Sequence, residues 1–238
     1  MQQVYFTDLG YTPYLETWQL QEQLMQKVIS SKLYNRQNIE PAQPIHNRLL
    51  FCEHPHVYTL GKSGSEKNLL ITADELAQHQ ATFFRINRGG DITYHGPGQC
   101  VGYPILDLDL FFNDVHKYMR YLEEVIIRTI AHYGIEGIRI PGLTGVWLAA
   151  TPTKPERKIC AFGVRLSRWV TMHGWALNVN NDLSFFNHIV PCGISDKAVT
   201  SIQQELGYAV EISETKQLLK LNFAHVFEVE TIDAQLAF

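Results

Sequence analysis

A window of fifteen residues, 88–102 (RGGDITYHGPGQCVG), holds the residue types most suited to binding a ligand. Its five glycines stand beside an arginine and a histidine. Glycine tolerates positive φ and lets a ligand approach the backbone closely, so a binding loop is expected here. A pair of tight hairpin turns is the alternative interpretation, and the window by itself does not choose between the two.

Cys192 stands in the segment IVPCGIS, between a proline that stiffens the chain and a glycine that frees it. A thiol reacts as its thiolate, and a reference pKa of about 8.5 leaves little thiolate at neutral pH unless a cation or a helix terminus is near. Cys52, Cys100 and Cys160 lie in apolar, strand-like runs, where cysteine behaves as a small buried hydrophobe. Cys192 is therefore the candidate nucleophile, and an ordinary turn cysteine is the alternative.

A lysine could supply the positive charge that such a thiolate needs. Lys158 opens the apolar run ICAFGVR, and Lys197 follows Cys192 by five residues. The residues alone leave both candidates open.

Two segments resemble nucleotide-binding motifs but do not match them. Gly96, Gly98 and Gly102 form GxGxxxG before a strand-like segment, whereas a dinucleotide-binding turn uses GxGxxG before a helix. Residues 61–63 (GKS) end like a phosphate-binding loop, but His56 stands where the first glycine is required. No nucleotide site is predicted from these motifs.

The histidines at positions 54, 56, 95, 173 and 188 show neither HExxH spacing nor a partner CxxC pair. We therefore predict no metal site. His95 and His173 are kept as pocket candidates, because each stands beside a glycine at the expected end of a strand.

The composition is that of a globular protein with a real core. Hydrophobic residues make up 45% and charged residues 18% of 238 residues, which excludes disorder as the main state. A formal charge of −4, without a basic run, argues against nucleic acid and anionic membranes as partners. The longest strictly apolar run, 146–150, is far shorter than the roughly 20 residues that span a bilayer. Widely spaced cysteines and an N-terminus unlike a signal or transit peptide predict free thiols in the cytoplasm.

The elements that must position these residues follow from periodicity. Helices are predicted at 14–33, 73–80, from Asp114 to Gly134 and at 213–228. Short β-branched or aromatic runs predict strands at 48–52, 57–61, 82–86, 99–108, 138–140, 145–149, 159–165 and 169–179. Short loops between the last four favour antiparallel neighbours. We expect one α/β (α+β) domain over residues 1–238, with helices on a mixed or antiparallel sheet.

Taken together and in order, these motifs resemble one enzyme family. RGGDITYHGPGQ, then VGYPILDL, then KICAFGVRLSRWVTMHGWALNVNNDLSFFNHIVPCGI are similar to the lipoyl(octanoyl) transferases, over about residues 48–207. The resemblance implies a biotin/lipoate protein ligase-like catalytic domain, similar to the core of class II aminoacyl-tRNA synthetases. Cys100 and Cys160 stand where small or aliphatic residues are expected in this family.

The resemblance also implies an activity. Such an enzyme moves an octanoyl (or lipoyl) group from acyl carrier protein to the lysine of lipoyl domains, as in 2-oxoacid dehydrogenase complexes and the glycine cleavage H protein. It uses neither ATP nor a metal.

By the same matching, Cys192 falls on the nucleophile that forms the acyl thioester, and Lys158 falls on its paired lysine. The implied substrate-binding residues are Arg88, Gly89, Gly90, Asp91, Ile92, Thr93, Tyr94, His95, Ala161, Phe162, Gly163, Gly174, Trp175 and Ala176, with His173 as a further pocket residue.

Three rival functions stay open on the sequence. An ATP-dependent lipoate or biotin ligase would share the fold but form an acyl-adenylate. A binding module would keep the pocket without turnover, and a cysteine hydrolase would pass the acyl group to water. For the transferase, we expect a basic docking surface for the acidic carrier, with Arg165, Arg168 and Lys154 as candidates.

Overall fold

The computed structural model describes residues 1–38, 40–190 and 198–236. In this part of the chain, a nine-stranded mixed sheet runs in the order β12-β1-β2-β6-β10-β9-β8-β7, with β11 added beside β9. Its strands are β1 (Gln2–Tyr11), β2 (Asn47–Glu53), β6 (Gln99–Ile105), β7 (Ile138–Ile140), β8 (Leu143–Leu148), β9 (Arg157–Ser167), β10 (Val170–Asn178), β11 (Ala198–Val199) and β12 (Val229–Asp233).

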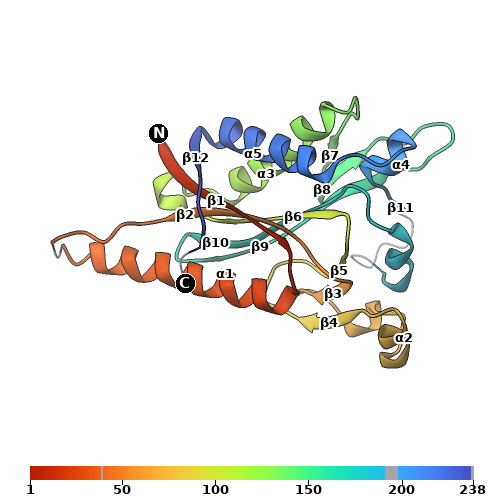
Figure 1. Ribbon diagram of the computed structural model, residues 1–238, viewed down its shortest axis with the longest axis horizontal. Coiled ribbons are helices and arrows are strands. Elements are labelled where there is room, and N and C mark those ends of the chain that lie inside the picture. Colours follow the sequence, from red (N-terminus) through yellow and green to blue (C-terminus); the bar gives the residue numbers. More distant parts are fainter. Residues whose placement is uncertain (39, 191–197, 237–238) are drawn as a thin grey trace.

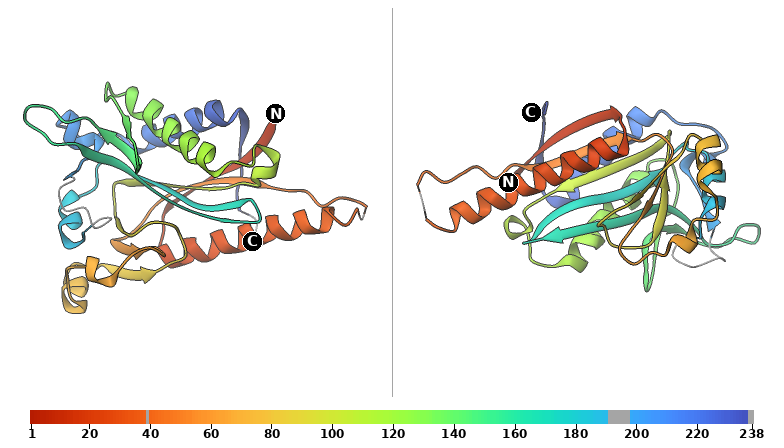
Figure 2. Two further views of the ribbon diagram at one scale, coloured as in Figure 1. Left: turned by 180° about the vertical axis from the view of Figure 1, so that it is seen from behind. Right: turned by 90° about the horizontal axis from the view of Figure 1, so that it is seen from below.

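Two helical layers enclose this sheet. Helix α1 (Tyr14–Asn35) covers one face, and α3 (Val115–Ala131) and α5 (Ile212–Phe227) cover the other (Figure 1). Figure 2 shows the same layers from behind and α1 from below. Two buried apolar clusters, one on each side of the sheet, form the core. The sheet is therefore buried on both faces, which suits its long apolar strands.

A smaller sheet lies at one end of α1. It runs in the order β4-β3-β5, with β3 (Val57–Leu60), β4 (Thr82–Arg85) and β5 (Ile92–His95). Helix α2 (Ala73–Gln78) packs beside it, and Thr72 and Glu75 form a capping box at its start. The short helices η1 (Glu66–Asn68), η2 (Leu108–Leu110), η3 (Leu183–His188) and α4 (Ile202–Leu206) complete the described elements.

Most of the predicted elements are confirmed. Helix α3 begins after Asp114, whose carboxylate accepts the Lys117 N–H at 2.9 Å. The strands β7, β8, β9 and β10 pair with their neighbours in antiparallel order, as their short loops indicate. The predicted fold class of helices on a mixed sheet is also correct.

Four strands, β1, β5, β11 and β12, were not predicted from the sequence. β1 and β12 pair in parallel, from Gln2 beside Val229 onward, although they stand at opposite ends of the chain. β5 lies inside the glycine-rich window, which was expected to form a binding loop or a pair of tight hairpin turns. Within the described residues, no helix is both long and apolar enough to cross a membrane.

Candidate active site

A cavity of about 480 Å³ lies where the small sheet meets β9 and β10. Its volume is in the range of small-molecule pockets. Of the substrate-binding residues predicted above, it is lined by Arg88, Gly89, Gly90, Asp91, Ile92, Thr93, His95, Ala161, Phe162, Gly163, Gly174, Trp175 and Ala176, and also by His173 and Lys158. The structure thus gathers three separate sequence segments around one space.

Small side chains on β9 and β10 leave room for this cavity. Gly174 stands opposite Gly163 and Ala176 opposite Ala161 in the antiparallel register. Gly174 is required for close packing on β6, because an added Cβ would overlap the Gly102 carbonyl oxygen. Gly163 is also required for packing, since an added Cβ would lie 2.7 Å from Arg88 Cδ.

The loop that carries Arg88 is fixed on both sides. The Gly89 N–H donates to the Val164 carbonyl of β9 at 2.9 Å. The buried Arg88 guanidinium donates from Nη2 to the Thr59 carbonyl at 2.6 Å and to Thr59 Oγ1 at 3.0 Å. The Lys62 N–H, in turn, donates to the Arg88 carbonyl at 3.0 Å. Residues 88–90 therefore bridge the small sheet and the large one at the edge of the cavity.

Lys158 lies near the start of β9. Its Nζ lies 4.5 Å from the centroid of the Trp147 ring, which is a cation–π contact. Lys158 pairs with Val199 of β11, and the Thr200 N–H donates to its carbonyl at 2.9 Å. Lys158 and Val164 both line the cavity, so the cavity follows β9 for roughly 20 Å at the rise of a strand.

Cys192 and Lys197 lie outside the described residues. Phe186 and Val199, which stand on either side of that stretch in the sequence, both line the cavity. The structure places the backbone of Val199 directly beside Lys158.

Two buried histidines line the cavity in their neutral form. Burial lowers the pKa of His95 to about 3 and that of His173 to about 3, and the Arg88 charge adds to both shifts. His95 Nδ1 donates to Gln99 Oε1 at 2.8 Å, a direction assigned because the Gln99 amide NH₂ donates elsewhere. His173 Nε2 lies 2.9 Å from Asn87 Oδ1. Both rings are therefore uncharged at neutral pH.

Tyr94 is placed apart from the other predicted site residues. Its ring packs in the core of the small sheet, stacked on Phe185 at 5.0 Å, and its hydroxyl lies 2.7 Å from His56 Nδ1. Because side chains alternate along a strand, Tyr94 points away from the side taken by Thr93 and His95.

Several lining residues were missed from the sequence. Tyr14 opens α1, Tyr103 lies on β6, and Met119 lies on α3. Each reads as an ordinary core position in its own element, so only the packing of the elements brings it to the cavity. Gly142, Leu143, Thr144 and Trp147 come from the turn between β7 and β8 and from β8 itself.

The other cysteines behave as predicted. Cys52, Cys100 and Cys160 are fully buried free thiols, and burial raises the pKa of each. Among the described residues, no three His, Cys, Asp or Glu side chains gather in a way that could hold a metal ion.

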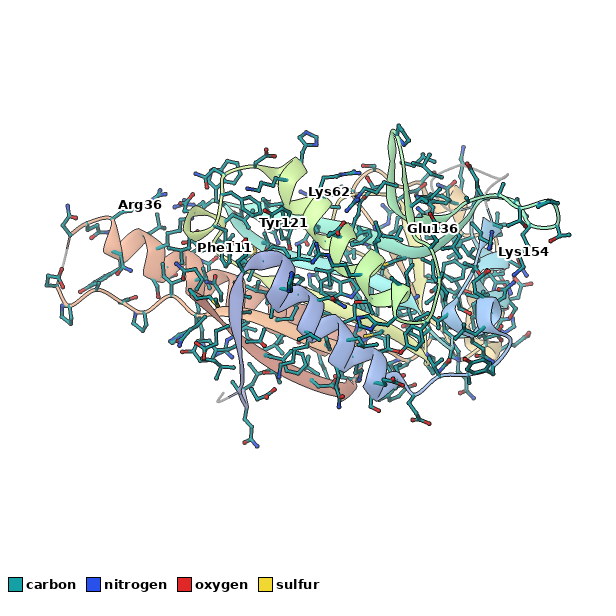
Figure 3. The ribbon with its side chains drawn as sticks, turned by 90° about the horizontal axis from the view of Figure 1, so that it is seen from above. Arg36, Lys62, Phe111, Tyr121, Glu136 and Lys154 are labelled. Atoms are coloured by element: carbon teal, nitrogen blue, oxygen red, sulfur yellow. The ribbon has the colours of Figure 1, made fainter. Side chains whose placement is uncertain are left out.

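The expected basic docking residues do not form one surface. Lys154 binds Glu205 at 3.2 Å on the loop before β9, whereas the Arg168 carbonyl accepts from Lys32 Nζ near the other end of that strand. Figure 3 shows Lys154 and Arg36, which lies one helical turn after Lys32, at opposite ends of the molecule. Arg165 is paired with Glu22 at 3.4 Å. The prediction that these three residues form a single basic docking surface is therefore wrong.

Comparison with known proteins places this geometry in a family. Residues 13–224 match the lipoyl protein ligase A/B catalytic domain. An octanoyltransferase of Christiangramia forsetii is 56% identical over 94% of this chain and 95% of its own length. Octanoyltransferases of Flavobacterium johnsoniae (56% identical, 94% and 97% covered) and Bacteroides thetaiotaomicron (51%, 90% and 90%) are similar to a comparable extent.

Solved structures agree on the fold. The lipoate protein ligase of an archaeal lipoylation system from Thermoplasma acidophilum superposes with a TM-score of 0.69 at 15% identity, covering 100% of this chain and 88% of that one. A lipoate-protein ligase A bound with ATP gives a TM-score of 0.67 at 14% identity, with 100% and 90% covered. At these identities, the likeness concerns the fold alone.

Proposed function

Because the chain belongs to the lipoyl protein ligase A/B catalytic domain family, we propose that it is an octanoyltransferase of protein lipoylation. The proposed donor is octanoyl-acyl carrier protein, and the proposed acceptor is the lysine of lipoyl domains such as those of 2-oxoacid dehydrogenases and the glycine cleavage H protein. The proposal is supported by octanoyltransferases at 50–56% identity that match most of the chain.

The observation that carries the proposal is the arrangement along β9. Lys158 lines the same cavity as the Gly163–Gly174 and Ala161–Ala176 pairs, which leave room for an unbranched acyl chain. Val199, seven residues after Cys192, pairs with Lys158. This register supports a reaction centre in which the thiol of Cys192 and the amine of Lys158 meet at the cavity.

In the first proposed step, the Cys192 thiolate attacks the carbonyl carbon of the donor thioester. A new S–C bond forms as the bond to the donor sulfur breaks, and the donor leaves as a thiolate that takes up a proton. The Lys158 ammonium stabilises the Cys192 thiolate and supplies that proton. One thioester replaces another, so this step requires no nucleotide.

In the second proposed step, the neutral amine of the acceptor lysine attacks the acyl-enzyme. An amide bond forms, the bond to Cys192 Sγ breaks, and the proton of the amine passes to Lys158, which is now neutral. The Cys192 thiolate and the Lys158 ammonium are thereby restored. The step is downhill because an amide is more stable than a thioester.

The test is a transfer assay with octanoyl-acyl carrier protein and an apo lipoyl domain, run with and without ATP. We expect octanoyl-lipoyl domain at the same rate in both reactions. As a control, a lipoyl domain whose target lysine is replaced by arginine receives no octanoate. Transfer that depends on ATP and releases AMP would instead assign an adenylating ligase. Free octanoate at one rate with or without the acceptor would assign a hydrolase.

A further inference from the structure

Glu123 is a fully buried carboxylate on the side of α3 that faces β8. Its Oε2 binds Arg120 at 2.9 Å and Arg139 at 3.1 Å, and its Oε1 accepts a long hydrogen bond from the Gly145 N–H at 3.4 Å. Burying a carboxylate is costly even when it is paired with arginine. The position of Glu123 therefore calls for a reason beyond linking α3 to β7.

Gly145 connects Glu123 to Lys158. Its φ of +139° is a conformation that side chains rarely adopt, and an added Cβ would lie 3.1 Å from Lys158 Cε and 3.0 Å from the Cys160 carbonyl. The aliphatic part of Lys158 thus lies against the backbone of Gly145. Lys158 Nζ contacts the Trp147 ring, which follows an irregularity of β8 between Val146 and Trp147. The Trp147 ring also lies beside Gly145, because the same added Cβ would be 3.1 Å from Trp147 Nε1.

We propose that Glu123 is a positioning residue for Lys158. Glu123 accepts a hydrogen bond from the Gly145 N–H and binds Arg139 of β7. These two contacts fix the position of the first half of β8, and the backbone of Gly145 there forms one wall beside the Lys158 side chain. The Lys158 ammonium is thereby held toward the cavity. This inference rests on the proposed function, because it assigns to Lys158 the role stated above.

The neighbouring Glu124 provides a matched control. It shares Arg139 with Glu123, through Nη2 at 2.7 Å, and binds Arg128 at 2.9 Å. Its side chain is part of the same charge network, but its hydrogen bonds go to arginines rather than to the wall beside Lys158. Loss of Glu124 therefore removes ion pairs of α3 and leaves the Gly145 contact in place.

The test compares Glu123→Ala, Glu123→Gln and Glu124→Ala by two readouts. The first is kcat and KM for octanoyl transfer. The second is the pH dependence of Cys192 alkylation by iodoacetamide, followed by mass spectrometry, which reports the thiol pKa without any acyl substrate. Thermal unfolding is measured for each variant, so that only folded proteins are compared.

We expect Glu123→Ala to lower kcat at least tenfold at nearly constant KM, and to raise the apparent pKa of Cys192. Glu123→Gln keeps an acceptor oxygen for the Gly145 N–H, so its kcat and its apparent Cys192 pKa should lie close to those of wild type. Glu124→Ala stays within twofold of wild type. If Glu123→Ala fails to fold, Gly145→Ala tests the same wall, because its Cβ displaces Lys158, and the same rise in the Cys192 pKa is expected.

The positioning role is overturned if Glu123→Ala and Glu124→Ala give the same kcat and alkylation profile, or if Glu123→Gln is as slow as Glu123→Ala. A parallel Lys158→Ala variant separates this failure from that of the proposed function. If Lys158→Ala leaves transfer and alkylation unchanged, the proposed pairing of Lys158 with Cys192 is wrong. If it changes both while Glu123→Ala changes neither, only the positioning role is wrong.

Discussion

The two ends of the cavity differ in how they hold charge. At one end, the Arg88 guanidinium donates to the carbonyl and hydroxyl of Thr59, and the nearby His95 and His173 are neutral. At the other end, the Lys158 ammonium lies on an aromatic ring, with the buried carboxylate of Glu123 behind Gly145. The first end is suited to fixing the shape of the pocket, and the second is suited to proton transfer. Substitutions at the Lys158 end should therefore lower the rate of transfer, and substitutions at the Arg88 end should lower the stability of the protein.

The largest effect is expected at the Lys158 end. Lys158→Ala removes the proposed proton donor, and kcat should fall by roughly 10²- to 10⁴-fold, the usual contribution of a general acid–base group. Single-turnover transfer from octanoyl-acyl carrier protein measures it. Lys154→Ala, on the loop before β9 and paired with Glu205, is the control and should stay near wild type. Equal rates for the two variants would contradict the role of Lys158 in proton transfer, on which the contrast between the two ends depends.

At the Arg88 end, the expected failure is structural. Arg88→Ala removes the buried hydrogen bonds to Thr59, and the free energy of unfolding should fall by about 1.5–3 kcal/mol. Urea unfolding with an unchanged m-value measures this loss. Arg85→Ala breaks only the exposed pair with Glu66, and should cost less than about 1 kcal/mol. A stable Arg88→Ala variant would show that the loop does not depend on this anchor.

Between the two ends, the cavity should select chain length. Ala161→Leu fills space beside Ala176, so kcat/KM for octanoyl relative to hexanoyl donors should fall roughly tenfold, the value of one or two methylenes in an apolar pocket. Competition between the two thioesters measures the ratio. Ala149→Leu, at an exposed position outside the cavity, should leave the ratio unchanged. An unaltered preference in Ala161→Leu would place the acyl chain elsewhere.

The smallest effect concerns pH. The folded-state pKa of His95 is lowered to about 3, so between about pH 6.5 and 3 the unfolded chain binds more protons, and stability falls as the pH falls. At pH 5.5, His95 alone should cost about 1.3 kcal/mol relative to pH 7. His95→Gln should show a correspondingly shallower loss of unfolding free energy, and His116→Gln, at an exposed position, should match wild type. Parallel curves for His95→Gln and wild type would contradict a neutral His95.

The sequence allowed prediction of those parts of the fold whose local signals agree. Helix α3 has both an apolar period and the Asp114 cap, and the hairpin of β9 and β10 has two largely apolar runs joined by a tight turn. β5 was hidden because glycines flank its four residues and its partner β3 stands more than thirty positions earlier. β1 and β12 were missed because their pairing is parallel and spans nearly the whole chain, which no local pattern reveals.

The candidate site could be predicted in its segments but not in its details. Residues 88–95, 161–163 and 174–176 were expected together, yet Tyr94 points to the other side of β5, as the alternation of a strand requires. The sequence does carry a signal for the buried Glu123. A carboxylate directly after Leu122, on the apolar side of a helix, is expected only where buried partners hold it. One partner, Arg120, lies on the same helix, but Arg139 and Gly145 come from β7 and β8, so their identity required the tertiary structure.

Intact-protein mass spectrometry tests the central claim most directly. Wild type and Cys192→Ser are incubated with octanoyl-acyl carrier protein without ATP, and an apo lipoyl domain is then added. We predict a single octanoyl adduct on wild type, absent from Cys192→Ser, that disappears as the lipoyl domain gains the same mass. Absence of an adduct, with transfer only after ATP is supplied, would contradict a covalent transfer through Cys192.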